Sequence, residues 1–370
     1  MRDAEVELLE HPLFVTVQDL QFHRFRTRLR LLITMSQSFT RRAPILNQQE
    51  LITHLTTSKI LTLQDPASTR PPLQTPLRDL SWSPYGNFLA TSSSDKVVRI
   101  WNPDRPLLRN TTELRGHTSP VLCALWSPAQ EGQLASIADG GAAAAGSPAD
   151  HHLRLWDMRS GKSTRSIDSG RENCSLAWSP DGNTIAVGNK ERTVRFFDVR
   201  GSDESHEDLQ LDGQHHHLIW SHSGRALFVA KADGNVDVID WPTLAVLHTI
   251  QAHTSACLHL TVDSLGEYLA IGGNDAMASL WDTTDWMCMK AFSQNEGPIL
   301  TCSFSFDSSF LATGTNEGAS MLIFHVESGQ HIHSIGTNNP PVCVRWHPSR
   351  YILAYLGDPV GMKLVGVSAD

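Results

Sequence analysis

The sequence lacks the features of a membrane-spanning, secreted or disulfide-stabilised protein. It contains no run of 18 apolar residues, so we expect no membrane-spanning helix. Its first ten residues, MRDAEVELLE, lack the basic-then-apolar pattern of a secretion signal, so we do not expect secretion. The six cysteines form no CxxC pair, a usage typical of a reducing compartment rather than of a disulfide framework.

Catalytic signatures are missing as well. The sequence has no GxSxG, Walker A or HExxH motif and no GxGxxG in a strand–helix setting, so we expect no enzyme activity, no cofactor and no small-molecule substrate. The formal net charge of −9 argues against a protein that coats nucleic acid through bulk charge, because phosphate neutralisation needs a cationic face. The 40% of hydrophobic residues indicates a globular protein with a large core.

A sevenfold repeat dominates the rest of the sequence. The segment LSWSPYGNFLA at residues 80–90 recurs six times in variant form, with an anchor residue at its third position. The anchors are Trp82, Trp126, Trp178, Trp220, Val262, Phe304 and Trp346. Their spacings are 44, 52, 42, 42, 42 and 42 residues, and the longest contains an Ala- and Gly-rich stretch, 140–149, that we interpret as an inserted loop. A second anchor follows about 19 residues after each first one, at Trp101, Trp156, Phe197, Ile239, Trp281, Phe324 and Val365.

Each repeat is predicted to form four short strands, because runs of apolar alternation are separated by turn residues. Four strands in 42 residues with a Trp-Asp ending resemble the WD40 repeat. Seven such repeats predict an all-β fold, a seven-bladed WD40 β-propeller, over residues 55–370. Residues 1–54 are expected to be a flexible N-terminal extension.

Closure of the ring needs a strand from outside the last repeat. Only five residues follow Val365, too few for a fourth strand. The segment 58–64 has strand composition, so we expect it to pair with the last blade and remove two open sheet edges.

A carboxylate stands six residues before the second anchor in five repeats, as Asp95, Asp150, Glu191, Asp233 and Asp275. The resemblance to WD40 repeats implies that this residue sits in a tight turn and bonds a histidine before the first strand. His117 and His253 fill that position, and Trp156 and Trp281 would complete two structural networks. Such buried polar networks are tolerated only when every member is satisfied. The first repeat has no corresponding histidine.

The histidine runs, 151–152 and 215–217, are not expected to bind a metal, and the cysteines are interpreted as core residues. Adjacent strand residues point to opposite faces, so His215–His217 cannot all ligate one ion, and no matching Cys/His spacing lies nearby. We therefore expect no metal site. Five cysteines precede first anchors at similar positions, which indicates apolar packing: Cys123, Cys174, Cys257, Cys302 and Cys343.

Function is therefore expected at the surface. The residue before each tight-turn position should point onto one face, and these residues form a candidate partner-binding rim: Ser94, Lys190, Asn274, Glu317 and Asp358, with Ala149 and Ala232. With one basic member the rim is no phosphate-binding ring, and it lacks an aromatic cage for methyl-lysine.

The arginine-rich stretch 20–42 is either a basic arm for RNA or targeting, or a disordered or partner-docked tail. The acidic cluster Asp203, Glu204, Glu207 and Asp208 is a solvated loop or a docking site for a basic segment.

Five sequence blocks carry a more specific resemblance: WSPDGNTIAVGNK (178–190), WPTLAVLHTIQAH (241–253), GGNDAMASLWD (272–282), MCMKAFS (287–293) and WHPSRYILAYLGD (346–358). They are similar, in this order, to the THO complex subunit 3 family, the WD40 subunits of the THO/TREX messenger-RNA export machinery. The resemblance implies a nuclear, non-catalytic scaffold that couples transcription and processing to export. It also implies docking onto long helical THO/TREX subunits and only indirect contact with RNA.

A second resemblance belongs to a different class. The motif WDxR at 156–159 and its near copy FDVR at 197–200 resemble substrate receptors of cullin-type ubiquitin ligases. In that interpretation Arg159 and Arg200 would contact the ligase adaptor. Alternatively, each arginine simply begins the turn into the fourth strand, and a generic WD40 scaffold is the third possibility.

Overall fold

The computed structural model describes residues 42–64, 77–104, 112–140, 149–170, 172–201, 208–358 and 361–367. Contacts divide the chain into two compact units, 1–41 and 42–370, and the fold below is that of the second unit. Several predicted features lie outside the described residues: the arginines of 20–41, most of the insert 140–149, and the acidic residues 203–207.

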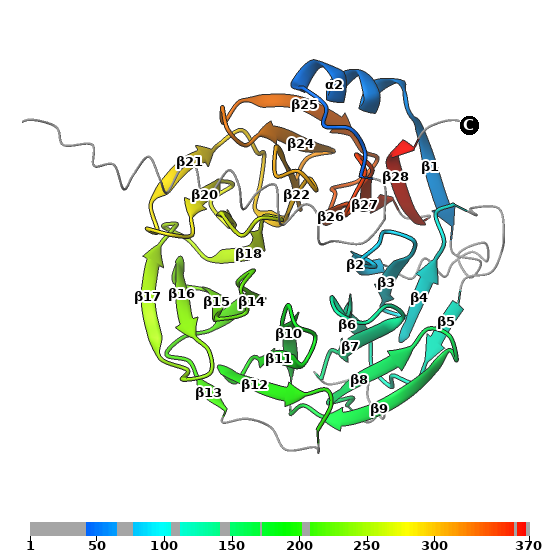
Figure 1. Cartoon of the computed structure of the whole chain (residues 1–370), viewed down its shortest axis with the longest axis vertical. Helices are drawn as coiled ribbons and strands as arrows, with labels where there is room; N and C mark the ends of the chain where they lie inside the picture. Colours follow the sequence, from blue (N-terminus) through cyan, green and yellow to red (C-terminus); the bar gives the residue numbers. More distant parts are fainter. Residues whose placement is uncertain are drawn as a thin grey trace, which may run out of the picture. The chain divides into compact units, whose positions relative to one another are not determined.

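In the described ranges the strands form seven antiparallel sheets of four, arranged as the blades of a ring (Figure 1). The predicted seven-bladed WD40 propeller is therefore confirmed. Blades one to three follow the chain from the innermost strand outward: β2 (Leu77–Trp82), β3 (Leu89–Ser93), β4 (Val97–Trp101) and β5 (Thr112–Arg115); β6 (Val121–Trp126), β7 (Gln133–Ala138), β8 (His152–Asp157) and β9 (Lys162–Asp168); β10 (Asn173–Trp178), β11 (Thr184–Asn189), β12 (Thr193–Asp198) and β13 (Leu209–Gln210).

Blades four to six repeat this order: β14 (His215–Trp220), β15 (Ala226–Lys231), β16 (Asn235–Asp240) and β17 (Val246–Gln251); β18 (Cys257–Val262), β19 (Tyr268–Gly273), β20 (Ala278–Asp282) and β21 (Cys288–Phe292); β22 (Ile299–Phe304), β23 (Phe310–Thr315), β24 (Ser320–His325) and β25 (His331–Gly336). Blade seven holds β26 (Cys343–Trp346), β27 (Leu353–Asp358), β28 (Gly361–Val367) and β1 (Lys59–Gln64).

Strand β1 closes the ring. It pairs antiparallel with β28, with Leu61 opposite Leu364 and Leu63 opposite Met362. Leu63 is buried in a cluster that also contains residues of blades one and seven. The expected closure by residues 58–64 is confirmed, and its cause is the missing fourth strand of the last repeat.

The first anchors tie neighbouring blades together. Each of four anchor indoles donates its Nε1–H to the backbone carbonyl of the residue that precedes the anchor of the blade before it: Trp82 to Arg345 (3.2 Å), Trp126 to Ser81 (3.2 Å), Trp178 to Leu125 (3.1 Å) and Trp220 to Ala177 (3.3 Å). Since these indoles are half-buried or buried, each bond also satisfies a polar group at a blade junction. The first of them joins blade one to blade seven and reinforces the closure.

The N-terminal boundary of the propeller unit differs from the expected one. The helix α2 (Gln48–Thr57) spans the boundary predicted at 54/55, and its Asn47 and Glu50 form a capping box. Leu51 and Leu55, one turn apart, are buried among residues of blades six and seven, so the compact unit begins at Arg42. Sequence periodicity missed this helix because ten residues give only one buried pair. In the described part of the chain, no helix is long and apolar enough to cross a membrane.

Candidate functional site

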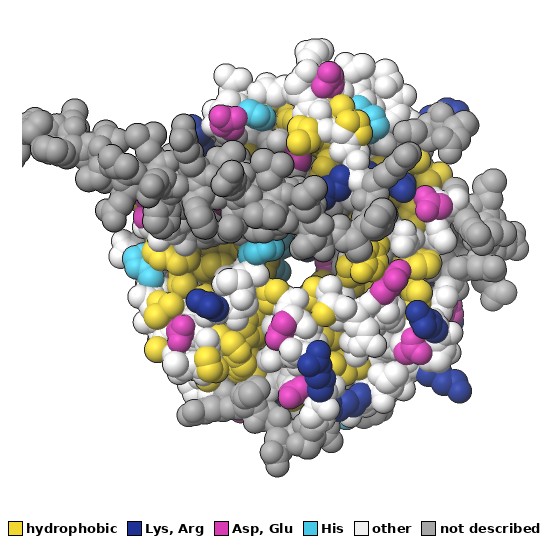
Figure 2. Space-filling model, in the orientation of Figure 1, with side chains coloured by type: hydrophobic (Ala, Val, Ile, Leu, Met, Phe, Trp, Pro, Cys, Tyr) yellow, Lys and Arg dark blue, Asp and Glu magenta, His cyan; other side chains and the backbone are white. Residues whose placement is uncertain are grey.

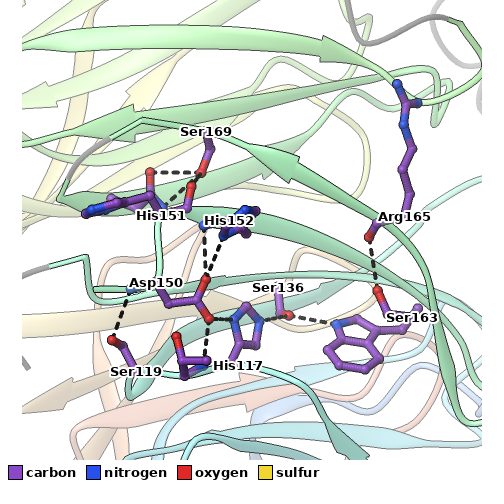
Figure 3. A network of polar contacts seen from close by, with 12 residues as sticks. His117, Ser119, Ser136, Asp150, His151, His152, Ser163, Arg165 and Ser169 are labelled. Carbon is purple, nitrogen blue, oxygen red and sulfur yellow. Dashed lines mark hydrogen bonds and ion pairs between the residues drawn. The ribbon is translucent and has the colours of Figure 1, made fainter. Parts of the chain in front are cut away.

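Blade two contains the first predicted network (Figure 3). His117 Nδ1 lies 2.8 Å from Asp150 Oδ2, and His117 Nε2 lies 2.7 Å from Ser136 Oγ. The indole of Trp156 donates to the same Ser136 oxygen at 2.8 Å. Because a carboxylate only accepts, Nδ1 carries the proton, Nε2 accepts from the serine hydroxyl, and the serine oxygen accepts from the indole. Every polar atom of this buried chain therefore has a partner.

The protonation states fit a structural network. Burial lowers the pKa of His117 by more than its hydrogen bond to Asp150 raises it, so the imidazole is neutral. Burial acts to raise the pKa of Asp150, but hydrogen bonds from His117 and from the backbone N–H of Thr118 outweigh it and hold the pKa well below its usual value. A neutral histidine bonded to a permanently ionised carboxylate has no proton to exchange near neutral pH.

Blade five repeats the arrangement with a different serine. His253 Nδ1 lies 3.0 Å from Asp275 Oδ2, and His253 Nε2 lies 2.9 Å from Ser279 Oγ. Trp281 donates to Ser279 at 2.8 Å. The structure thus brings together all six residues that the sequence assigned to these networks. The two serines were missed because Ser136 comes from the second strand of its blade and Ser279 from the third, so no fixed spacing marks them.

Blades one and four use cations where a histidine is missing. In blade one Arg99, 1% exposed, donates through both terminal nitrogens to the tight-turn Asp95. In blade four Lys231, 4% exposed, lies 3.0 Å from Asp237 and 3.7 Å from the tight-turn Asp233. Charged groups this deeply buried need such partners. The missing histidine of blade one is therefore replaced by an arginine two residues before its second anchor.

The candidate rim residues each belong to a different blade, in the turn between its second and third strands or, for Asp358, at the end of the second strand. Lys190, Asn274 and Glu317 are exposed, Ser94 is half-buried and accepts from Arg78 Nε at 2.9 Å, and Asp358 ends β27 with a side chain outside the described residues. Ala149 is half-buried and Ala232 is exposed. The structure therefore distributes the rim around the ring and does not gather it into one cluster.

The two candidate adaptor arginines are both exposed, in the turns that follow β8 and β12. The backbone N–H of Arg159 donates to Asp157 at 3.0 Å, and that of Arg200 donates to Asp198 at 2.7 Å. The Asp of each WDxR motif thus closes the turn, and the arginine side chain is left on the surface.

The channel wall holds a stacked pair of imidazoles, His217 and His259, with ring centroids 4.3 Å apart. Their Nδ1 atoms accept from the backbone N–H of Leu260 and of Cys302. Burial lowers the pKa of His217 to about 3 and that of His259 well below its usual value. Both line a cavity of about 410 Å³ together with Arg345. No cluster of three or more His, Cys, Asp or Glu side chains able to hold a metal occurs among the described residues.

The cysteines are free thiols, and burial raises the pKa of Cys257, Cys302 and Cys343 to about 12. Such thiols stay protonated and unreactive near neutral pH. They pack in the blades as the repeat pattern predicted.

The outermost strands of blades four and five carry a feature that the sequence analysis missed. Four apolar side chains on or directly before these strands are about half exposed or more: Val246 (58%), Leu247 (61%), Met287 (60%) and Met289 (49%). Large exposed apolar groups that lie together mark interaction surfaces on soluble proteins. Periodicity could not reveal them, because an outer strand with apolar residues has the same pattern whether it is covered or open.

Comparisons with known proteins agree with this architecture. The WD domain, G-beta repeat model matches residues 70–102, 108–157, 162–198 and 286–321, and the anaphase-promoting complex subunit 4 WD40 domain model matches 206–263. The chain is 32% identical to THO complex subunit 3 of Arabidopsis thaliana over 78% of this chain and 88% of that protein. It is 30% identical to the WD repeat-containing protein AAC3 of Dictyostelium discoideum, over 75% of this chain and 60% of that one.

The fold has a counterpart among solved structures. The β-propeller domain of Myceliophteria thermophila Cps50 (Swd1) superposes with a TM-score of 0.67 at 17% identity, covering 79% of this chain and 96% of that one. At this identity the likeness concerns the fold alone.

Proposed function

Because this chain belongs to the THO complex subunit 3 family of WD40 propellers, we propose that it is a non-catalytic scaffold subunit of the nuclear THO/TREX complex. Its role is to couple transcription and processing to messenger-RNA export. It binds other THO/TREX subunits, above all their long helices, and reaches RNA through the complex.

One observation carries this proposal. The 32% identity extends over 88% of the Arabidopsis subunit, so it covers the propeller as a whole rather than one shared repeat. Fold alone would not support a function, because WD40 propellers serve many unrelated ones.

The geometry of the described residues is compatible with recognition as the only chemistry. The His–Asp–Ser–Trp network of blade two is buried, that of blade five is partly buried, and both are satisfied. The channel histidines are neutral. The turns and the outer strands are the parts of the ring that partners can contact, and the hydrogen bonds at the blade junctions hold them in place.

The ubiquitin-ligase receptor remains the alternative from a different class, because both WDxR-type arginines, Arg159 and Arg200, are exposed. One experiment separates the two functions. The tagged chain is purified from nuclear extract, and the bound proteins are quantified by mass spectrometry. We expect THO subunits in stoichiometric amounts, reduced by neither Arg159→Ala nor Arg200→Ala. Recovery of a cullin adaptor without THO subunits, lost in those variants, would contradict the proposal.

A further inference from the structure

Four exposed apolar side chains lie on or directly before the outer strands of blades four and five and are here termed the outer patch: Val246 and Leu247 of β17, Met287 just before β21, and Met289 of β21. Trp286 connects its two halves, because its ring stacks on His248 of β17 with centroids 6.1 Å apart and packs edge-on against Phe228 of blade four at 5.8 Å. Figure 2 shows hydrophobic side chains reaching the surface at the margin of the ring that carries β17.

Blade two, in its described residues, lacks such a group of exposed apolar residues. In blade two the corresponding start of β9 is Lys162, Ser163, Thr164 and Arg165, which are polar. Charged residues on outer strands prevent unwanted strand pairing at the edges of blades. An exposed apolar outer strand lacks this protection. Such edges are either covered in the assembled protein or act as aggregation sites.

Strand register identifies the place on blade six that corresponds to the outer patch. Val246 pairs with Ile239, Cys288 with Trp281, and His331 with Phe324, each opposite a second anchor. The next residue of each strand is therefore equivalent in the three blades: Leu247, Met289 and Ile332. Leu247 and Met289 are exposed, whereas Ile332 is half-buried.

A helix covers the blade-six position. The helix α2 contacts β25, and Ile332 packs against the cluster that contains the α2 residues Leu51 and Leu55 (Figure 1). In blade six, therefore, the apolar residue at this register is covered by a short amphipathic helix that has two apolar residues one turn apart. In the described part of the chain, no element covers the same register of blades four and five.

The charges around the outer patch add a second requirement. Asp240 and Asp282 end β16 and β20, the strands that precede β17 and β21, Asp285 lies in the turn before β21, and Lys290 is the one cation in β21. A complementary helix would carry basic residues beside its apolar stripe, because opposite charges at the rim of an interface steer association.

We propose that the outer patch binds an amphipathic helix of another THO subunit, with apolar residues spaced three or four apart and flanked by Lys or Arg. The proposal rests on the proposed function for the identity of the partner. The helical conformation and the register are argued from α2 alone. The helix lies across β17 and β21 as α2 lies beside β25, and it buries Leu247 and Met289.

The first test measures affinity. The full chain and its Leu247→Ser/Met289→Ser variant are titrated against a purified THO complex assembled without its subunit 3. Removing two apolar side chains from the contact should weaken binding on the order of 100-fold, about tenfold for each. The matched control is Ile60→Ser, which removes an equally exposed apolar side chain (52%) from the outer strand of blade seven and should bind as the unmodified chain does. All three proteins should have the same melting temperature, since none of these side chains is buried.

The second test identifies the conformation of the occupant. A photo-reactive benzoyl-phenylalanine replaces Leu247 or Met289, and the crosslinked residues are mapped in the assembled complex. Crosslinks to one partner segment at spacings of three, four or seven residues support a helix. Spacings of two would show strand addition, and crosslinks between two copies of this chain would show a homodimer. Either result would overturn the proposal.

The outcomes separate the two proposals. If the unmodified chain binds THO and the double variant binds equally well, the outer patch is not the docking surface, while the proposed function stands. If the unmodified chain does not bind THO at all, both proposals fall.

Discussion

The buried neutral histidines make the propeller sensitive to mild acid. His215 and His347 are 5% and 3% exposed, and burial lowers the pKa of each to about 4. Burial lowers the pKa of His217 to about 3. In the unfolded chain these groups have the ordinary value of 6.5, so between pH 6.5 and 4 the unfolded state binds protons that the folded state does not.

The sign and the size of the effect follow from proton linkage. Stability rises with pH wherever the unfolded state binds more protons, so the contribution is fully present above pH 6.5 and is lost as the pH falls below it. From pH 7.5 to pH 5, each such histidine costs about 2 kcal/mol, and the three together cost about 6 kcal/mol. A domain is typically stable by about 5–15 kcal/mol, so the melting temperature should fall steeply by pH 5.

Substitution by asparagine tests the assignment. The Nδ1 atoms of His217 and His347 accept from the backbone N–H of Leu260 and of Ser349, and the asparagine Oδ1 can take over that role. His217→Asn and His347→Asn should therefore flatten the dependence of the free energy of unfolding on pH between 7.5 and 5. His222→Asn is the control, because the side chain of His222 is exposed. Urea titrations at four pH values measure the free energy of unfolding. If the unmodified chain has the same free energy of unfolding at pH 7.5 and at pH 5, the reasoning is refuted.

Three further results are expected. Deletion of residues 55–65 should lower the melting temperature far more than deletion of 1–41, because the first removes β1 and the buried Leu63; equal melting temperatures would disprove closure by β1. Asp275→Ala should destabilise the fold by about 1–3 kcal/mol, since it leaves the buried His253 Nδ1–H unpaired, and should weaken partner binding only in proportion. Unchanged chemical denaturation together with lost THO binding would make this Asp a contact residue. The chain lacking residues 1–41 should bind single-stranded RNA weakly at two salt concentrations, because its rim has Lys190 as its only basic member; tight, salt-insensitive binding in an anisotropy titration would reveal an RNA site.

The repeat architecture could be predicted because its physical cause is periodic. Anchors such as Trp82 and Trp126 recur at the blade junctions, where each indole bonds the neighbouring blade, so their spacing is the spacing of the blades. Closure by β1 was also predictable, since the last repeat is visibly one strand short. The turn carboxylates and their histidines could be placed because each pair keeps a fixed offset from an anchor.

The non-periodic features escaped prediction. Arg99 lies on the third strand of its blade, whereas His117 and His253 precede the first strand of theirs. Ser136 and Ser279 bond these histidines from two different strands. Helix α2 was missed because its stability comes from two leucines packed on blades six and seven, not from its own pattern. The outer patch depends on what covers an outer strand, which is a property of three-dimensional neighbours and not of local sequence.

Membership of the THO assembly is tested most directly by mass photometry. The purified chain, 40.9 kDa, is mixed with a purified THO complex that lacks its subunit 3. We expect the mass of the complex to rise by 40.9 kDa for each copy bound, at nanomolar concentrations and with the unmodified chain. An unchanged mass of the THO complex, with the chain remaining free, would contradict its function as a THO scaffold.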